Sequence, residues 1–167
     1  DSGFVMLGEV DNNILLMKSN RYGDMEWQQS FGGSQMDMAS HIEQASDGGF
    51  IISATTESYG QGGKDIWLFK TSSSGLIEWN KYIGTPYDDY SGQVLETDDG
   101  GFILIGSRGS SDQNNNDIWL IKTNSQGDSS WTRSYGGNQF DRGNDILADD
   151  QGGFILLGST EIQSEGN

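Results

Sequence analysis

The stretch Asp65–Trp79, with the sequence DIWLFKTSSSGLIEW, occurs three times along the chain. It returns as DIWLIKTNSQGDSSW at Asp117–Trp131 and, more loosely, as NILLMKSNRYGDMEW at Asn13–Trp27. Each copy begins 52 residues after the one before it. A constant period of this length is the signature of a repeat architecture. We therefore interpret the whole 167-residue chain in units of this repeat.

Two further elements keep the same register. A Gly-Phe segment precedes each copy, and a polar segment with an aspartate follows each tryptophan; the segments with phenylalanine read DSGFVMLG, DGGFIISA, DGGFILIG and QGGFILLG. The first unit is six residues shorter, and the spacing places the deletion in one loop, where GEVDNN replaces ATTESYGQGGKD. Repeats vary at loops and persist at strands, so this localisation supports the alignment.

Each unit reads as four short strands separated by turns rich in Gly, Asn, Asp and Ser. In the second unit the expected strands are Ser40–Ala45, Gly49–Ala54, Asp65–Thr71 and Ile77–Ile83. The Asp-Gly pairs between the first two strands are typical of tight hairpins, and the 25 glycines disfavour helices. Four antiparallel strands per unit predict an all-β fold, a β-propeller built from four-stranded blades.

The expected chain is one β-propeller segment of about three and a quarter blades. It divides into a partial blade at 1–36, blades at 37–88 and 89–140, and a partial blade at 141–167. The strands expected are three, four, four and two. Because propellers need at least four blades, either a dimer or a longer parent chain would complete the ring. We favour a longer parent, because the terminal strand near Gly153 duplicates the one near Gly3.

Composition excludes several partners. The formal net charge is −16, so nucleic-acid phosphates and anionic membranes are repelled. No apolar run reaches the 18 residues of a membrane span, and the chain contains no cysteine for a disulfide or a thiolate metal site. Cations, basic proteins and neutral glycans remain as partners.

The pattern DGGFI…DIWLxKT…G…W resembles the tryptophan-docking segment of quinoprotein-type propellers. It is also similar to propeller repeats of large secreted or surface-anchored bacterial and archaeal proteins. The resemblance covers essentially the whole chain. It implies a β-propeller fold and an extracellular or cell-surface location.

The repeated side chains have two interpretations each. Trp27, Trp79 and Trp131 are expected to wedge between neighbouring blades, although tryptophans can also form sugar-stacking platforms. Trp67 and Trp119 are the better platform candidates, because the first unit has leucine there. For the charged residues we hypothesise that each lysine pairs with an aspartate at a strand start; the alternative is solvent-facing charge. The two sets are Lys18, Lys70 and Lys122, and Asp37, Asp89 and Asp141.

Metal and catalytic sites have weaker support in the sequence. The acidic turns Asp88-Asp89, Asp98-Asp99 and Asp149-Asp150 raise a calcium hypothesis, because Ca²⁺ binds loop carboxylates and carbonyls. No D-x-D-x-D-G loop is present, and no other cofactor is expected. The single histidine, His41, has Gln93 and Asp145 at its repeat position, which disfavours a catalytic triad.

The leading functional hypothesis is a non-enzymatic extracellular or cell-surface scaffold that binds protein or glycan through blade loops. Two alternatives are a structural module that self-associates by strand addition, and a fragment of a quinoprotein-like or lyase-like propeller enzyme. The two loops that vary most between units are the expected contact regions. Their candidate residues are Ser58, Tyr59, Gln61, Lys64, Asp112, Asn114 and Asn115.

Overall fold

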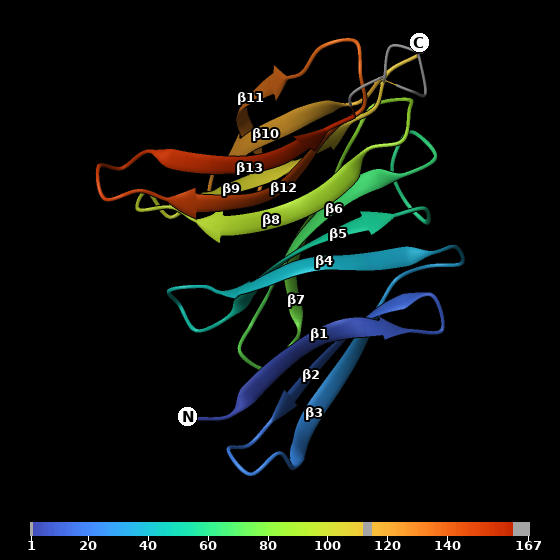
Figure 1. The fold of residues 1–167 in the computed structure, drawn as a ribbon. Coiled ribbons are helices and arrows are strands. Elements are labelled where there is room, and N and C mark those ends of the chain that lie inside the picture. Colours follow the sequence, from blue (N-terminus) through green and yellow to red (C-terminus); the bar gives the residue numbers. More distant parts are fainter. Residues whose placement is uncertain (1, 112–114, 162–167) are drawn as a thin grey trace.

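The computed structural model describes residues 2–111 and 115–161. Within them the fold is all-β, as predicted: thirteen strands form antiparallel sheets without a helix (Figure 1). The sheets contain three, four, four and two strands, in the predicted order. No helix in the described part of the chain is long and apolar enough to cross a membrane.

Each sheet is a run of consecutive strands that pair with their neighbours in the chain. The first sheet contains β1 (Phe4–Val10), β2 (Asn13–Ser19) and β3 (Met25–Phe31). The second contains β4 (Asp37–Gln44), β5 (Phe50–Thr56), β6 (Asp65–Thr71) and β7 (Ile77–Ile83). The third contains β8 (Tyr90–Glu96), β9 (Phe102–Arg108), β10 (Asp117–Thr123) and β11 (Ser129–Tyr135). The last contains β12 (Asp141–Ala148) and β13 (Phe154–Thr160).

The bounds of the two C-terminal strands of the second sheet match the prediction, whereas β4 and β5 differ from it. β4 begins at Asp37, three residues earlier than predicted, because Asp37 and Met38 pair with Thr56 and Thr55 of β5. β5 runs from Phe50 to Thr56, so it starts and ends later than expected. The six-residue deletion is confirmed: the β1–β2 turn is only Asp11–Asn12, whereas the β5–β6 loop runs from 57 to 64.

The sheets stack in a row, face against face, and the hydrophobic core lies between them. Ile14 of the first sheet packs in one cluster with Phe50 and Phe69 of the second. On the other face of the second sheet, Leu68 packs in a cluster with Leu104 of the third. Strand alternation explains this arrangement, because successive side chains point to opposite faces. The inner strands β5, β6 and β9 of the two central sheets are therefore buried on both faces.

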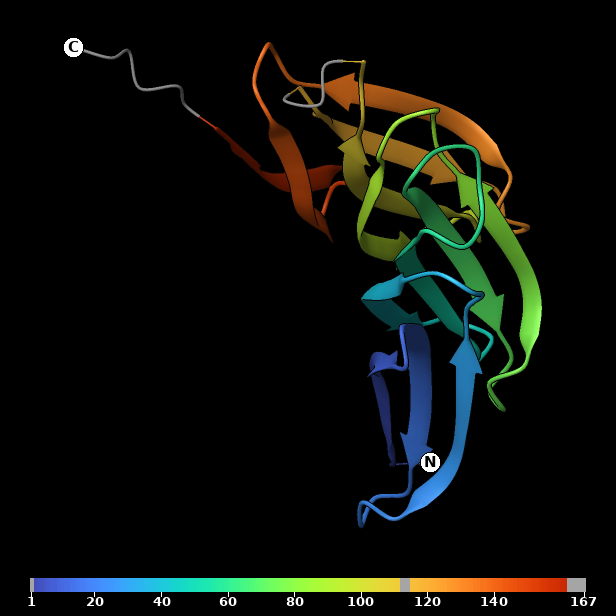
Figure 2. The same ribbon diagram turned by 90° about the vertical axis from the view of Figure 1, so that its right-hand side faces the viewer.

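Figure 2 shows that the row of sheets curves into an open arc. The last strands of the first three sheets, β3, β7 and β11, run along the convex side of this arc. The two ends of the row, at β1–β3 and at β10–β13, lie at opposite ends of the molecule in both views.

The repeated tryptophans do join neighbouring sheets. A Cβ atom placed on Gly75 would lie 2.7 Å from Cζ3 of Trp27, and one on Gly127 would lie 2.5 Å from Cζ3 of Trp79. Each indole thus covers a glycine in the last turn of the next sheet; we call this the Trp–Gly contact. The sequence interpretation of packing is confirmed for Trp27 and Trp79, whereas Trp131 is 40% exposed.

The interpretation of Trp67 and Trp119 as sugar platforms is wrong, because both side chains are buried in the core. The ring of Trp67 lies 4.7 Å from that of Phe69, centroid to centroid, within the cluster between the first two sheets. Trp119 lies in the cluster between the second and third sheets. Their faces are therefore covered by protein.

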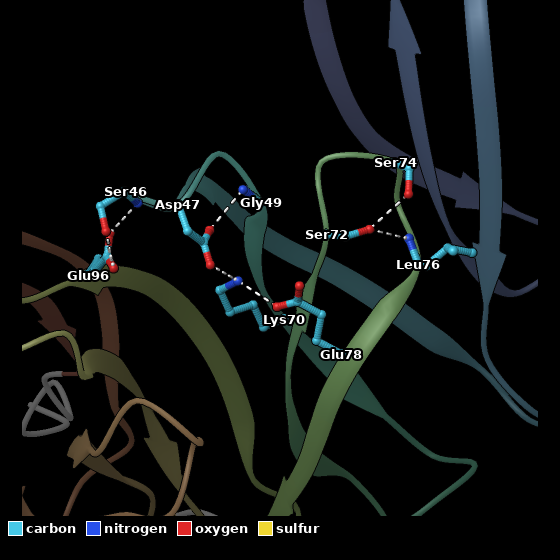
Figure 3. Close-up of polar contacts among 9 residues, drawn as sticks. All are labelled: Ser46, Asp47, Gly49, Lys70, Ser72, Ser74, Leu76, Glu78 and Glu96. Carbon is cyan, nitrogen blue, oxygen red and sulfur yellow. Dashed lines mark hydrogen bonds and ion pairs between the residues drawn. The ribbon is translucent and has the colours of Figure 1, made fainter.

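The hypothesis that the lysines pair with the strand-start aspartates is also wrong. Lys70 Nζ lies 2.5 Å from Asp47 in the β4–β5 turn and 2.7 Å from Glu78 in β7 (Figure 3). Lys122 repeats the first contact with Asp99 at 2.9 Å, and Lys18 pairs with Glu26. The β4–β5 and β8–β9 turns and the strands β7 and β3 supply these carboxylates, rather than Asp37, Asp89 and Asp141.

The strand-start aspartates instead hold the loops before and beside them. Asp37 accepts hydrogen bonds from the amide of Gly33 and the hydroxyl of Ser58, each at 2.8 Å. Asp89 accepts from the amide of Gly109 at 2.8 Å, and Asp141 accepts from Gly137 at 3.0 Å. All three side chains are buried. Burial raises the pKa of Asp89, and its hydrogen bonds from Thr85 and Gly109 partly offset that effect.

Candidate functional site

The first strands of three successive units lie side by side and form the floor of a groove. β8 contacts both β4 and β12. Each of the three strands carries a β-bulge at the same repeat position, between Ala39 and His41, Ser91 and Val94, and Gly143 and Asp145. Bulges re-aim side chains and are common beside functional sites. Three irregular strand segments therefore meet on one surface.

The groove has a volume of about 540 Å³. Its lining is about equally polar and apolar, and it includes hydroxyl, amide, imidazole, guanidinium and carboxylate groups. The lining residues are Ser40, His41, Tyr90, Ser91, Gly92, Gln93, Ser107, Arg142, Gly143, Asn144 and Asp145. The three residues at the bulge position, His41, Gln93 and Asp145, differ in every unit. One backbone geometry thus presents three different polar groups.

Hydrogen bonds between the units fix this floor. The side-chain oxygen of Gln93 accepts from the amide of Ile146 at 2.8 Å. The hydroxyl of Ser53 donates to the carbonyl of Gly92 at 2.6 Å, and the amide of Ser91 donates to the hydroxyl of Thr55 at 3.0 Å. The polar groups of a bulge would otherwise be left unpaired, so these bonds hold the groove in one shape.

His41 is neutral near pH 7. Burial lowers the pKa of its imidazole, and the nearby carboxylate of Asp145 and a hydrogen bond to the backbone of Val94 oppose that shift. Its Nδ1 atom is buried without a hydrogen-bond partner. Burial thus favours the neutral imidazole, and its Nδ1 atom lies buried rather than open to the groove.

Tyr90 connects the groove to the loops at one end of the sheets. The guanidinium of Arg142 lies 5.9 Å from the centroid of its ring, and Lys64 Nζ lies 5.3 Å from the same centroid. Tyr90 also lines a second pocket, of about 280 Å³, with Asp88, Ser110 and Asn116. Two of the nine basic side chains of this acidic chain are therefore placed around one aromatic ring.

In the first predicted contact loop, residues 57–64, most candidate residues form hydrogen bonds that stabilise the loop itself. The Ser58 hydroxyl bonds to Asp37, and the Tyr59 hydroxyl donates to the carbonyl of Gly32 at 2.9 Å. The amide of Gln61 donates to Asp65 at 3.0 Å. Of this set, only Lys64 reaches toward the groove, through Tyr90.

The second predicted loop is described only in part. Asn115 is half-buried, and its side-chain amide lies 3.0 Å from the carbonyls of Gly137 and Gln139 when its nitrogen faces them. Asp112 and Asn114 lie outside the described residues. The neighbouring Ser110 and Asn116 line the second pocket, so this loop adjoins the groove surface at Tyr90.

Metal and nucleophilic chemistry receive no support from the geometry. Within residues 2–111 and 115–161, no group of three or more His, Asp or Glu side chains is placed to hold a metal ion. The calcium hypothesis therefore stays a prediction. At two of the acidic turns the carboxylates bond within the turn itself: Asp99 accepts from the amide of Gly101 at 3.0 Å, and Asp149 accepts from the amide of Gly153 at 2.7 Å. No serine hydroxyl in the described part of the chain bonds to His41.

Sequence reasoning missed Tyr90, Gln93 and Arg142 as site residues. The available signal was the variation at the His41 position, which differs in all three units, as do the three positions before it. A position whose residue type varies between repeats is not constrained by core packing. When such a position also lines a groove, its side chains are available to contact a ligand.

Comparison with known proteins gives a fold and no activity. No family model matches the chain, and no curated protein sequence matches it. A crystal structure at 1.35 Å resolution of a protein of unknown function from Bacteroides caccae is similar, with a TM-score of 0.57 and 9% identity. The similarity covers 93% of this chain and 54% of that one, so the chain spans about half the length of its structural neighbour.

Proposed function

We propose that the chain is a β-propeller segment that binds a glycan, without catalysis, in the groove formed by β4, β8 and β12. The juxtaposition of three bulged first strands carries this proposal, because it presents His41, Gln93 and Asp145 side by side. Sugar hydroxyls are recognised by planar amides and carboxylates, and binding sites commonly combine a few such groups on a preformed surface. We place this binding outside the cell or at its surface.

Three observations support the propeller interpretation. The sheets are four-stranded where complete, they stack in an arc, and their neighbours are joined by Trp–Gly contacts. A sheet stack that curves in this way brings the first strands together on one side, where ligands meet several units at once. Weak contacts from several units then sum to a useful affinity.

The groove offers more contact chemistry than the variable loops. Its polar groups come from three units, whereas Ser58, Tyr59 and Gln61 are engaged in bonds within or beside their own loop. The cations Lys64 and Arg142 lie beside Tyr90 and give this part of an acidic chain a local positive charge, which would pair with a carboxylate of a glycan.

The test is titration of the full chain with a panel of neutral and uronate-containing oligosaccharides, followed by NMR or calorimetry. Gln93→Leu and Arg142→Ala should each weaken binding about ten-fold, the effect of losing one good polar contact. Arg21→Ala, on an exposed turn of the first sheet, is the matched control and should leave binding unchanged.

Two results would overturn the proposal. One is the absence of binding across the whole panel. The other is binding that survives both groove substitutions but disappears when Asp11–Asn12 replaces the loop 57–64. That second result would assign recognition to the loop. Separately, binding of a protein in place of a glycan would contradict the proposed ligand class.

A further inference from the structure

The Trp–Gly contacts inside the molecule include a charged pair. Trp79 covers Gly127, and two residues further along β7 Lys81 Nζ lies 2.5 Å from Asp128 Oδ1. The contact therefore matches an indole to a glycine, and a cation to the acid that follows that glycine. The first unit has the indole without the cation, since Gln29 holds the position of Lys81.

The indole and cation of this contact occur again at one end of the stack, and the glycine and acid occur again at the other end. On β11, Trp131 and Arg133 hold the positions of Trp79 and Lys81. Trp131 is 40% exposed, and no described glycine lies against its ring; the guanidinium of its own neighbour Arg133 lies 5.6 Å from the ring centroid. The outer edge of the third sheet is thus an unused indole–cation face.

The matching turn lies in the first sheet. Gly23 and Asp24 hold the positions of Gly127 and Asp128, and Gly23 has the same left-handed backbone, with φ of 88°. A Cβ atom placed on Gly23 would meet nothing within 4 Å, so the space that an indole fills elsewhere is open here.

The apolar face beside this turn is open as well. Phe4 and Met6 hold the positions of Phe50 and Ile52, which are buried between the first two sheets. Phe4 is 57% exposed and Met6 is 43% exposed. The first sheet therefore presents the same receiving face that the second sheet presents to it.

These two surfaces lie at opposite ends of the arc, so they cannot meet within one molecule (Figures 1 and 2). We propose that they dock between two copies of this chain, with Trp131 over Gly23 and Arg133 paired with Asp24. The second copy is the occupant because its end supplies the glycine, the acid and the apolar face that the interior contact requires. Such a head-to-tail interface is heterologous and builds rings or filaments.

Docking involves an exchange of strands. β1 and β13 hold the same position of the repeat, with Phe4 corresponding to Phe154. In a complete four-stranded sheet, β1 of the second copy pairs with β12 in the place of β13. β1 can take this place because β13 is the edge strand of its sheet, and its inward-facing Phe154 and Leu156 hold the repeat positions of Phe4 and Met6. An open sheet edge that accepts a strand in this way is a general route to association.

The test uses two variants, each blocked at one end. Trp131→Ala removes the indole; Gly23→Asn keeps the left-handed turn, which asparagine tolerates, but fills the space for the ring. Each variant alone should remain monomeric in sedimentation velocity, at concentrations where the natural chain gains mass. An equimolar mixture should form a 1:1 heterodimer and stop there, because each partner keeps one working end.

Gly100→Asn is the matched control, since Gly100 also has positive φ and open space at its Cβ position. It should associate like the natural chain. Circular dichroism confirms that the variants keep their fold. A natural chain that stays monomeric at every concentration, a Trp131→Ala variant that associates normally, or a mixture without heterodimer would each overturn the proposal.

Charge reversal tests the ion pair separately. Arg133→Glu and Asp24→Arg should each weaken association about five-fold, the scale of one exposed ion pair, and the two changes in one chain should restore it. Additive weakening in the double variant would contradict the Arg133–Asp24 pairing.

Discussion

The second and third units share the strand sequences DIWLFKT and DIWLIKT, yet the same residues are in different surroundings. β6 is buried along its whole length, whereas β10 is only half-buried at Asp117, Ile118 and Lys122. The second unit has a full sheet on one side and a three-stranded sheet on the other. The third unit has only the β12–β13 hairpin beyond it.

The same difference appears at the tryptophan and at the lysine. Trp79 covers a glycine of the next sheet, and Trp131 covers none that is described. Lys70 binds two carboxylates, and Lys122 binds one, because Ser130 holds the position of Glu78. A repeated residue therefore has no fixed energetic value; its contribution depends on the neighbouring unit.

The largest expected effect comes from the two tryptophans. Trp79→Ala should lower the free energy of unfolding by about 3 kcal/mol, because it leaves a void between two sheets. Trp131→Ala should cost about 1 kcal/mol or less, since its ring is exposed in the monomer. Urea unfolding at concentrations where the chain is monomeric measures both. Equal losses would show that the neighbouring sheet does not set the difference.

The glycine under the indole gives a second contrast. Gly127→Ala should cost about 2 kcal/mol, because the residue has positive φ and its new methyl group would meet the Trp79 ring. Gly100→Ala, with a similar backbone and open space, should cost about 1 kcal/mol. Thermal melts of both variants measure the difference. If Gly100→Ala destabilises as much, backbone strain alone accounts for the loss.

The lysines are expected to differ less, because their partners are exposed. Lys70→Met should destabilise by about 1 kcal/mol and Lys122→Met by about half of that, the range of solvent-screened ion pairs. A double-mutant cycle of Lys70→Met with Asp47→Ala should show coupling. Hydrogen bonding to Lys70 lowers the pKa of Asp47, so this contribution should fade as the solution is acidified below the usual aspartate range. Additive losses in the cycle would show that Lys70 and Asp47 are not energetically coupled.

The smallest effect concerns the groove. His41→Gln gives the second unit the residue of the third, Gln93. Burial lowers the pKa of His41, so the unfolded chain takes up a proton first as pH falls through about 6.5, and the folded state loses stability there. Between about pH 7.5 and about pH 5, the melting temperature of His41→Gln should therefore fall less than that of the natural chain. Parallel pH profiles would mean that His41 does not titrate differently on unfolding.

Periodicity accounts for what the sequence predicted well. The strand number, the grouping of strands and the position of the deletion all follow from segments that keep a 52-residue step. Buried strands hold this step because an insertion would move their side chains to the wrong face. The packing role of Trp27 and Trp79 followed from the same regularity.

The same regularity explains why the lysine partners were predicted wrongly. Asp47, Glu78 and Asp89 all lie in segments with the same period, so spacing alone cannot choose among them. The choice depends on the hairpin, which brings the β4–β5 turn beside the end of β6. The groove could not be predicted for another reason. The residues at the bulge, Ser40 and Asn144 among them, share no residue type, and an extra residue in a strand leaves no periodic signal.

The buried aspartates have a consequence for engineering. Asp37, Asp89 and Asp141 fasten the loops next to them, and the strands on either side of a loop keep their pairing whatever its length. Val10 pairs with Asn13 across two residues, and Thr56 pairs with Asp65 across eight. The scaffold therefore accommodates loops of two and of eight residues at this end without a change in strand register.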